Sequence, residues 1–110
     1  MYEIHKKLGA KIVEFAGWEM PVQYEGIREE HRAVRASAGL FDVSHMGEIF
    51  VTGPEAKAFT QWLTTNDVEG VKEYQAQYTL LCNREGGVID DVIIYKFADD
   101  KFLFCVNASN

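Results

Sequence analysis

AQYTLLCNREGGVIDDVIIY at residues 76–95 decides the fold of this chain. β-Branched and aromatic residues alternate on both sides of the turn residues 84–87, which predicts two antiparallel strands over 75–83 and 88–97. A further strand-like segment, 101–108, follows the short polar link 98–100. The C-terminal half is therefore predicted to contain two consecutive hairpins.

Helical signals dominate the sequence upstream of these hairpins. Apolar residues recur at helical spacing over 1–8, 27–38 and 54–64, and Gly9 and Gly39 follow the first two segments as stop signals. Brief strands are expected at 11–15 and 46–51, with an irregular stretch at 17–26. His31 falls on the apolar stripe of 27–38, where a hydrogen-bonded core histidine is expected. The whole pattern predicts one globular α+β unit, with short helices packed on a mainly antiparallel sheet.

The composition excludes several classes of protein. The chain has 110 residues, of which 47% are hydrophobic, and a net charge of −6. No apolar run approaches the ~20 residues that span a bilayer, so no membrane association is expected. The charged N-terminus is unlike a secretory signal, which predicts a cytoplasmic protein. Scattered cations and excess acid argue against a nucleic-acid partner and favour a neutral or mixed-charge ligand.

Metal, nucleotide and hydrolase motifs are not found. Cys82 and Cys105 are predicted to be free and buried, and the histidines lack ligand spacing, so no metal site is expected. Ser44 and His45 are adjacent on an extended segment and would point in opposite directions, which excludes a catalytic triad with Asp42. The glycines at 86–87 lie between two strands, so they predict a hairpin turn and not a phosphate loop.

Asp91 is the strongest catalytic candidate. Strand alternation places it in one row with Ile89, Ile93, Tyr95 and Phe97, while Asp90 falls in the other row. An isolated carboxylate in an apolar row is expected to be paired, protonated or functional. A purely structural role remains open, in which Asp91 caps backbone amides or pairs with an arginine such as Arg28 or Arg35.

The first hairpin is expected to bring aromatic side chains to Asp91. A two-residue loop at 86–87 would set Tyr78 opposite Tyr95 and Cys82 opposite Asp91. A carboxylate flanked by tyrosines is typical of a site for a planar heterocycle.

Several segments carry a resemblance to a known family. The segments are GAKIVEFAGWEMPVQY at 9–24, EEHRAVRASAGLFDVSHMGE at 29–48, LTTND at 63–67, AQYTLLCNREGGVIDDVIIY at 76–95 and VNASN at 106–110. FDVSHMGE at 41–48 and GGVIDD at 86–91 are the most specific motifs. Together the segments closely resemble the N-terminal third of the T protein of the glycine cleavage system, an aminomethyltransferase, over essentially all 110 residues.

The resemblance implies a reaction and its participants. The family takes the aminomethyl group from the lipoyl arm of H protein, releases ammonia and passes the carbon to tetrahydrofolate, with no metal or covalent cofactor. Asp91 matches the family's catalytic aspartate, which hydrogen-bonds the folate near N10 and helps N5 attack the methylene carbon. The implied folate contacts are Met46, Tyr78, Ile93, Tyr95 and Asn107.

The family's chain is several times longer, so the sequence is expected to be an N-terminal fragment of a larger multidomain enzyme and to be inactive alone. Two alternatives stay open. The chain could be a non-catalytic folate-binding or assembly module, or a fragment of the folate domain of a sarcosine or dimethylglycine dehydrogenase.

The second hairpin decides whether Asn107 can belong to the site. A two-residue loop at 99–100 would turn Asn107 away from Asp91. A three-residue loop at 98–100, or an equivalent bulge, would pair Phe97 with Lys101 and set Asn107 opposite Asp91, with Leu103 and Cys105 on the same face. We predict the second arrangement because the resemblance places Asn107 at the folate.

Overall fold

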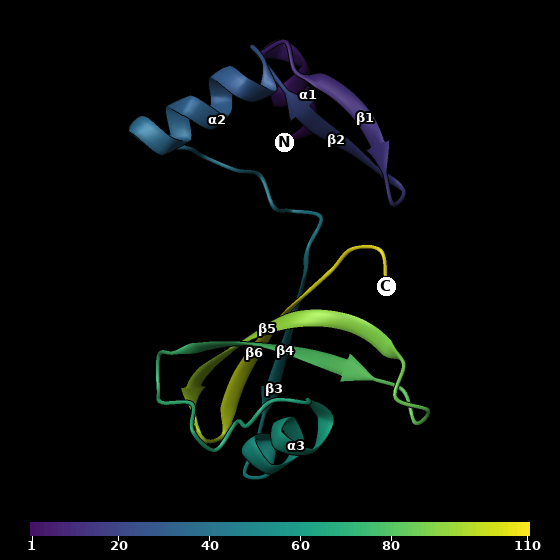
Figure 1. Cartoon of the computed structure of the whole chain (residues 1–110), viewed down its shortest axis with the longest axis vertical. Coiled ribbons are helices and arrows are strands. Elements are labelled where there is room, and N and C mark those ends of the chain that lie inside the picture. Colours follow the sequence, from purple (N-terminus) through teal and green to yellow (C-terminus); the bar gives the residue numbers. More distant parts are fainter. The chain divides into compact units, whose positions relative to one another are not determined.

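The computed structural model describes all 110 residues and contains helices and antiparallel sheets, which confirms the α+β class (Figure 1). The chain divides into two compact units, Met1–Val43 and Ser44–Asn110, where the sequence predicts one. The elements are α1 (Tyr2–Lys7), β1 (Lys11–Phe15), β2 (Trp18–Gln23), α2 (Ile27–Ala36), β3 (Gly47–Thr52), α3 (Ala56–Leu63), β4 (Ala76–Cys82), β5 (Val88–Ala98) and β6 (Lys101–Val106).

The first unit contains a strand that the sequence analysis missed. β2 pairs with β1 in a hairpin whose turn residues, Ala16 and Gly17, both have positive φ angles of 50° and 81°. Pro21 makes this stretch look irregular in the sequence, because proline has no backbone N–H to donate to a neighbouring strand. In a two-stranded sheet each strand has one unpaired edge, so β2 tolerates the missing donor. The stretch 17–26 is thus partly a strand and not irregular throughout.

α2 has a strongly amphipathic pattern but buries none of its residues. His31 is exposed, so the expectation of a core histidine is wrong for this chain. The periodicity identified the helix correctly, but nothing in the first unit covers its apolar stripe.

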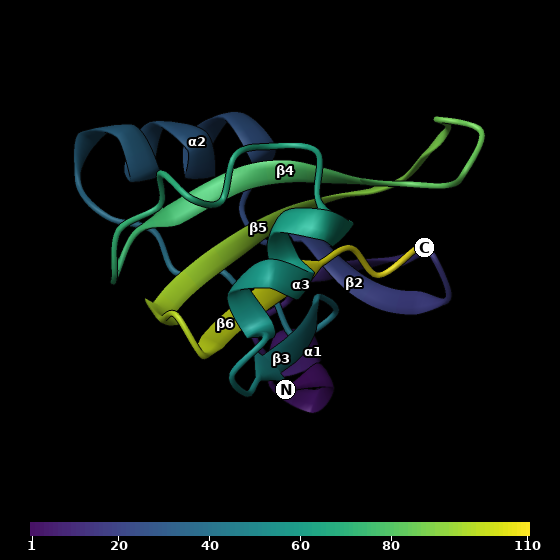
Figure 2. The same cartoon turned by 90° about the horizontal axis from the view of Figure 1, so that it is seen from below.

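The second unit is a four-stranded antiparallel sheet in the order β3-β6-β5-β4. The two consecutive hairpins, β4–β5 and β5–β6, are confirmed. α3 packs on one face of the sheet against β3 and β6 (Figure 2). The core between α3 and the sheet consists of Ala56, Val68, Val92, Ile94, Phe102 and Phe104.

Two charged residues of β5, Asp90 and Lys96, lie in the buried row with Val92 and Ile94. Lys96 Nζ donates to the carbonyl oxygen of Val71 at 3.0 Å and forms a 2.6 Å ion pair with Asp99. The ammonium group therefore has a carbonyl and a carboxylate partner, which offset the cost of burying its charge.

The β4–β5 turn is wider than predicted. The Asn83 carbonyl oxygen accepts a hydrogen bond from the backbone N–H of Gly86, and the Asn83 N–H donates to the carbonyl oxygen of Gly87. The side-chain Oδ1 of Asn83 accepts hydrogen bonds from the backbone N–H groups of residues 85 and 87. Gly86 adopts a φ of 83°, a left-handed conformation that favours glycine. The loop and a bulge at Leu81/Cys82 shift the register by two residues.

Tyr78 consequently pairs with Ile93 and not with Tyr95, and Asp91 pairs with Leu80 and not with Cys82. The predicted register is wrong. Because the shift is even, however, every side chain keeps its predicted face.

The β5–β6 hairpin agrees with the predicted alternative. A bulge between Lys96 and Ala98 takes the place of a third loop residue. Ile93 pairs with Cys105 and Tyr95 with Leu103, as expected for the register that brings Asn107 to Asp91.

The helices, the potential metal ligands and the cysteines bear on the other expectations from the sequence. No helix has the length and apolar character that crossing a membrane demands. No cluster of three or more potential metal-ligating side chains occurs. Both cysteines are free, but they are half-buried where full burial is predicted.

Candidate functional site

The face of the sheet opposite α3 is not covered by any part of the second unit. We call this surface the open face. Tyr78 is 59% exposed, and Ile93 and Tyr95 are each 38% exposed. Strand pairing and alternation assign it Glu48, Phe50, Ala76, Tyr78, Leu80, Ile89, Asp91, Ile93, Tyr95, Leu103 and Cys105. Its aromatic and aliphatic surface suits a flat, partly apolar ligand.

Asp91 lies on the open face with both carboxylate oxygens engaged. The Tyr78 hydroxyl donates to Oδ2 at 3.0 Å, and the Asn107 side-chain amide donates to Oδ1 at 3.0 Å. The hydrogen bond to Asp91, together with desolvation and the carboxylate's charge, raises the pKa of Tyr78. The tyrosine therefore stays protonated and acts as the donor. The carboxylate is held in one orientation, which is the condition for a precisely placed base or charge.

This environment corrects one step of the sequence argument. Asp91 is exposed and not embedded in a buried apolar row, because the core that includes Ala56 of α3 lies against the other face of β5. Its side-chain partners are a tyrosine and an asparagine, so the arginine pairing considered for it is absent. Alternation separated the two rows correctly but could not tell which row is covered.

Asp90 is the carboxylate that is buried, at 5% exposure. Burial pushes the pKa of its carboxyl group up, but hydrogen bonds from the side chains of Asn107 and Asn110 and from the backbone of Asn107 and Asp91 outweigh this effect and lower the pKa. The sequence analysis did not select Asp90 as a site residue. The sequence signal that could have identified it is the alternation of β5, which places Asp90 in one row with Val92 and Ile94.

The strands bring five of the six predicted site residues together. Tyr78, Asp91, Ile93 and Tyr95 share the open face, and Asn107 reaches Asp91 directly. Met46, the sixth, is half-buried and immediately precedes β3, whose first residue, Gly47, pairs with Val106.

Gly47 permits a close approach at this end of β3. A Cβ atom there would lie 2.6 Å from Cγ2 of Val106. A larger residue would disturb the pairing of β3 with β6 beside Met46 and Asn107.

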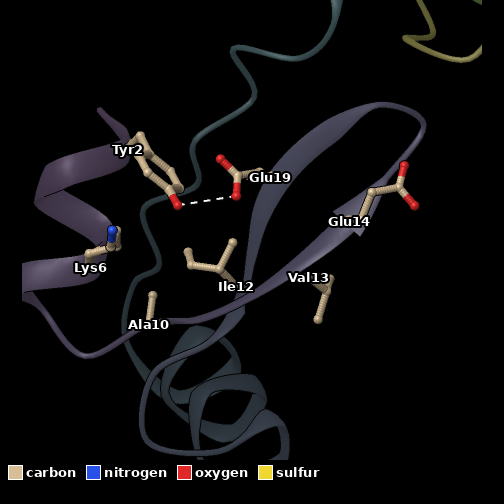
Figure 3. A pocket seen from close by; sticks show the side chains of 7 residues that line it. All are labelled: Tyr2, Lys6, Ala10, Ile12, Val13, Glu14 and Glu19. Atoms are coloured by element: carbon tan, nitrogen blue, oxygen red, sulfur yellow. Dashed lines mark hydrogen bonds between the residues drawn. The ribbon is translucent and has the colours of Figure 1, made fainter.

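A hollow of about 580 Å³ lies in the first unit and contains none of the predicted site residues (Figure 3). The Tyr2 hydroxyl donates to Glu19 Oε1 at 3.2 Å across it. It is lined by Tyr2, Lys6, Ala10, Ile12, Val13, Glu14 and Glu19. The Lys6 ammonium lies 5.0 Å from the centroid of the Tyr2 ring. These contacts are exposed and place no oriented carboxylate among aromatic side chains, so the open face is the stronger candidate for chemistry.

The fold and the open face correspond to a known class of domain. Residues 1–110 match the family model described as GCVT N-terminal domain, and the chain belongs to this family.

Particular relatives are named aminomethyltransferase. The protein from Chloroherpeton thalassium is 59% identical, that from Lysinibacillus sphaericus 58%, and that from Desulfitobacterium hafniense 54%, each over all 110 residues of this chain and 30% of the relative. The structure of glycine cleavage system aminomethyltransferase T from Bartonella henselae superposes with a TM-score of 0.93 at 44% identity. That match covers 99% of this chain and 30% of the other. The chain thus spans under a third of the length of these relatives and corresponds to the N-terminal part of a larger enzyme.

Proposed function

We propose that this chain forms part of an aminomethyltransferase that moves a one-carbon unit from a lipoyl-bound aminomethyl group to tetrahydrofolate. The lipoyl group is carried by the H protein of the glycine cleavage system. The observation that carries the proposal is the Asp91 carboxylate, held between Tyr78 and Asn107 on an aromatic face. Membership of the GCVT N-terminal domain family and the names of the relatives support it.

The residues of the open face fit a reduced pterin. Tyr78 and Tyr95 offer flat apolar surface, and Ile93 adjoins both, since it pairs with Tyr78 across β4 and β5 and lies two residues before Tyr95 on β5. Asp91 and Asn107 supply an acceptor and an amide at one edge of this surface. Such a mixture of aromatic walls and a few convergent polar groups is what orients a heterocycle with polar edges.

The chemistry requires a negative, proton-accepting group. In the net reaction the methylene carbon loses its bonds to the amine nitrogen and to the lipoyl sulfur and gains bonds to N5 and N10 of the folate. The two folate N–H protons leave on ammonia and on the thiol. The Asp91 carboxylate can accept a proton from a folate amine and stabilise the positive charge that develops as ammonia departs. Hydrogen bonds from Tyr78 and Asn107 hold the carboxylate in one orientation.

The test is an assay of the full-length protein with aminomethylated H protein and tetrahydrofolate. Ammonia and methylenetetrahydrofolate should appear in equal amounts and depend on both substrates. Folate binding without ammonia release would instead support a non-catalytic binding module. Activity only with free sarcosine or dimethylglycine and a flavin-dependent partner would support the dehydrogenase alternative.

A further inference from the structure

The Asp90 carboxylate accepts three hydrogen bonds and the neighbouring Asp91 carboxylate two, although Asp90 lies on the covered face. Oδ2 accepts the backbone N–H of Asn107 at 3.1 Å, and Oδ1 accepts the side-chain amides of Asn107 at 2.8 Å and Asn110 at 2.6 Å. Its side chain therefore engages the segment that follows β6 through both of its oxygens.

Asn107 connects the two carboxylates. Its Nδ2 atom donates to Asp90 Oδ1 at 2.8 Å, to the Asp91 carbonyl oxygen at 2.8 Å and to Asp91 Oδ1 at 3.0 Å. All three partners are acceptors, so only the NH₂ end of the amide can face them. An amide flipped by 180° would place its oxygen against the carboxylates.

We propose that Asp90 is a positioning residue for the transfer reaction, which fixes the Asn107 amide so that it in turn orients the Asp91 carboxylate. The inference rests on the proposed function and adds to it a residue that does not touch the substrate. Asp90 is placed to do this because consecutive residues of β5 point to opposite faces, while Asn107, just beyond the end of β6, reaches both.

Replacement of Asp90 by asparagine tests the proposal. Asparagine has the same shape but one acceptor oxygen, so it cannot satisfy both the backbone N–H and the side-chain amide of Asn107 without a donor-donor conflict. In the full-length enzyme we expect Asp90→Asn to lower kcat by about tenfold or more and to change KM for tetrahydrofolate by about threefold or less.

A double-mutant cycle separates positioning from general destabilisation. If Asp90 acts through Asn107, the Asp90→Asn/Asn107→Ala enzyme should have the kcat of Asn107→Ala within about twofold. Two losses that multiply would overturn the proposal. Should Asp90→Asn yield no folded enzyme, Asp90→Glu replaces it, and the same non-additivity is expected.

Two further variants complete the design. Asp99→Asn removes a carboxylate that pairs with Lys96 in the β5–β6 turn, and its kcat should equal that of wild type. Asp91→Asn, measured in parallel, tests the proposed function itself. An inactive Asp91→Asn enzyme beside an Asp90→Asn enzyme with wild-type kcat overturns only the positioning role. Full activity of Asp91→Asn overturns the proposed role of Asp91 and the inference with it.

Discussion

Replacement of Asp91 by asparagine should remove its charge and leave its geometry intact. The asparagine oxygen can still accept from Asn107, and its NH₂ group can donate to the Tyr78 hydroxyl, which is able to reverse its role. The loss in rate is therefore mainly electrostatic. A unit charge about 4 Å from the developing positive charge is worth about 4 kcal/mol at an effective dielectric constant of about 20, which corresponds to a loss of roughly 10³-fold in kcat.

The assay is steady-state methylene transfer by the full-length enzyme, with folate affinity measured separately by calorimetry. The affinity should change only modestly, because both neighbouring hydrogen bonds survive. Tyr78→Phe is the matched control, since it removes one hydrogen bond to Asp91 but keeps the charge, and it should lower kcat far less than Asp91→Asn does. A kcat of Asp91→Asn within a few-fold of wild type would refute the electrostatic reasoning.

Three other outcomes are expected. Phe102→Ala, at a fully buried core position, should lower the free energy of unfolding in urea by about 3–5 kcal/mol, while Asp100→Ala in the exposed turn should change it little. Because the folded-state pKa of Asp90 is lowered, its contribution to stability is present above the ordinary carboxyl pKa and is lost as the pH falls through and below about 4. Acid titration of stability should thus be less steep for Asp90→Asn than for wild type, and equal slopes would contradict the assignment. The isolated 110-residue chain should bind tetrahydrofolate weakly or not at all, since Tyr78 and Tyr95 remain exposed in it; micromolar affinity by calorimetric titration would show that the site is self-contained.

The hairpins and the grouping of the site residues were predictable because they depend on local signals. The alternation of β5 separates Asp91 from Asp90 without any knowledge of the rest of the fold. The register of β5–β6 was predicted only with the help of the family resemblance, since the two-residue loop was equally compatible with the local sequence.

The burial of the two carboxylates could not be predicted, because it depends on where α3 packs. Nothing in 88–97 indicates which row faces the helix. The prediction of the β4–β5 register was wrong for a similar reason, because the register depends on side-chain contacts that the strand pattern does not reveal. The Asn83 side chain completes the turn by accepting hydrogen bonds from the backbone N–H groups of residues 85 and 87. Asn83 lies one residue before 84–87, the segment identified as the turn from the sequence.

The two adjacent aspartates also make the site sensitive to strand slippage during folding. If β5 shifted by one residue against its neighbours, Asp91 and Tyr95 would both enter the core, Asp91 without its donors, and Asp90 would emerge beside Tyr78 of β4. A misregistered sheet would then carry an unsolvated charge, with a cost of several kcal/mol, and would be depopulated. The same pair of carboxylates therefore disfavours the wrong register and prevents a misfolded chain from presenting a site-like surface.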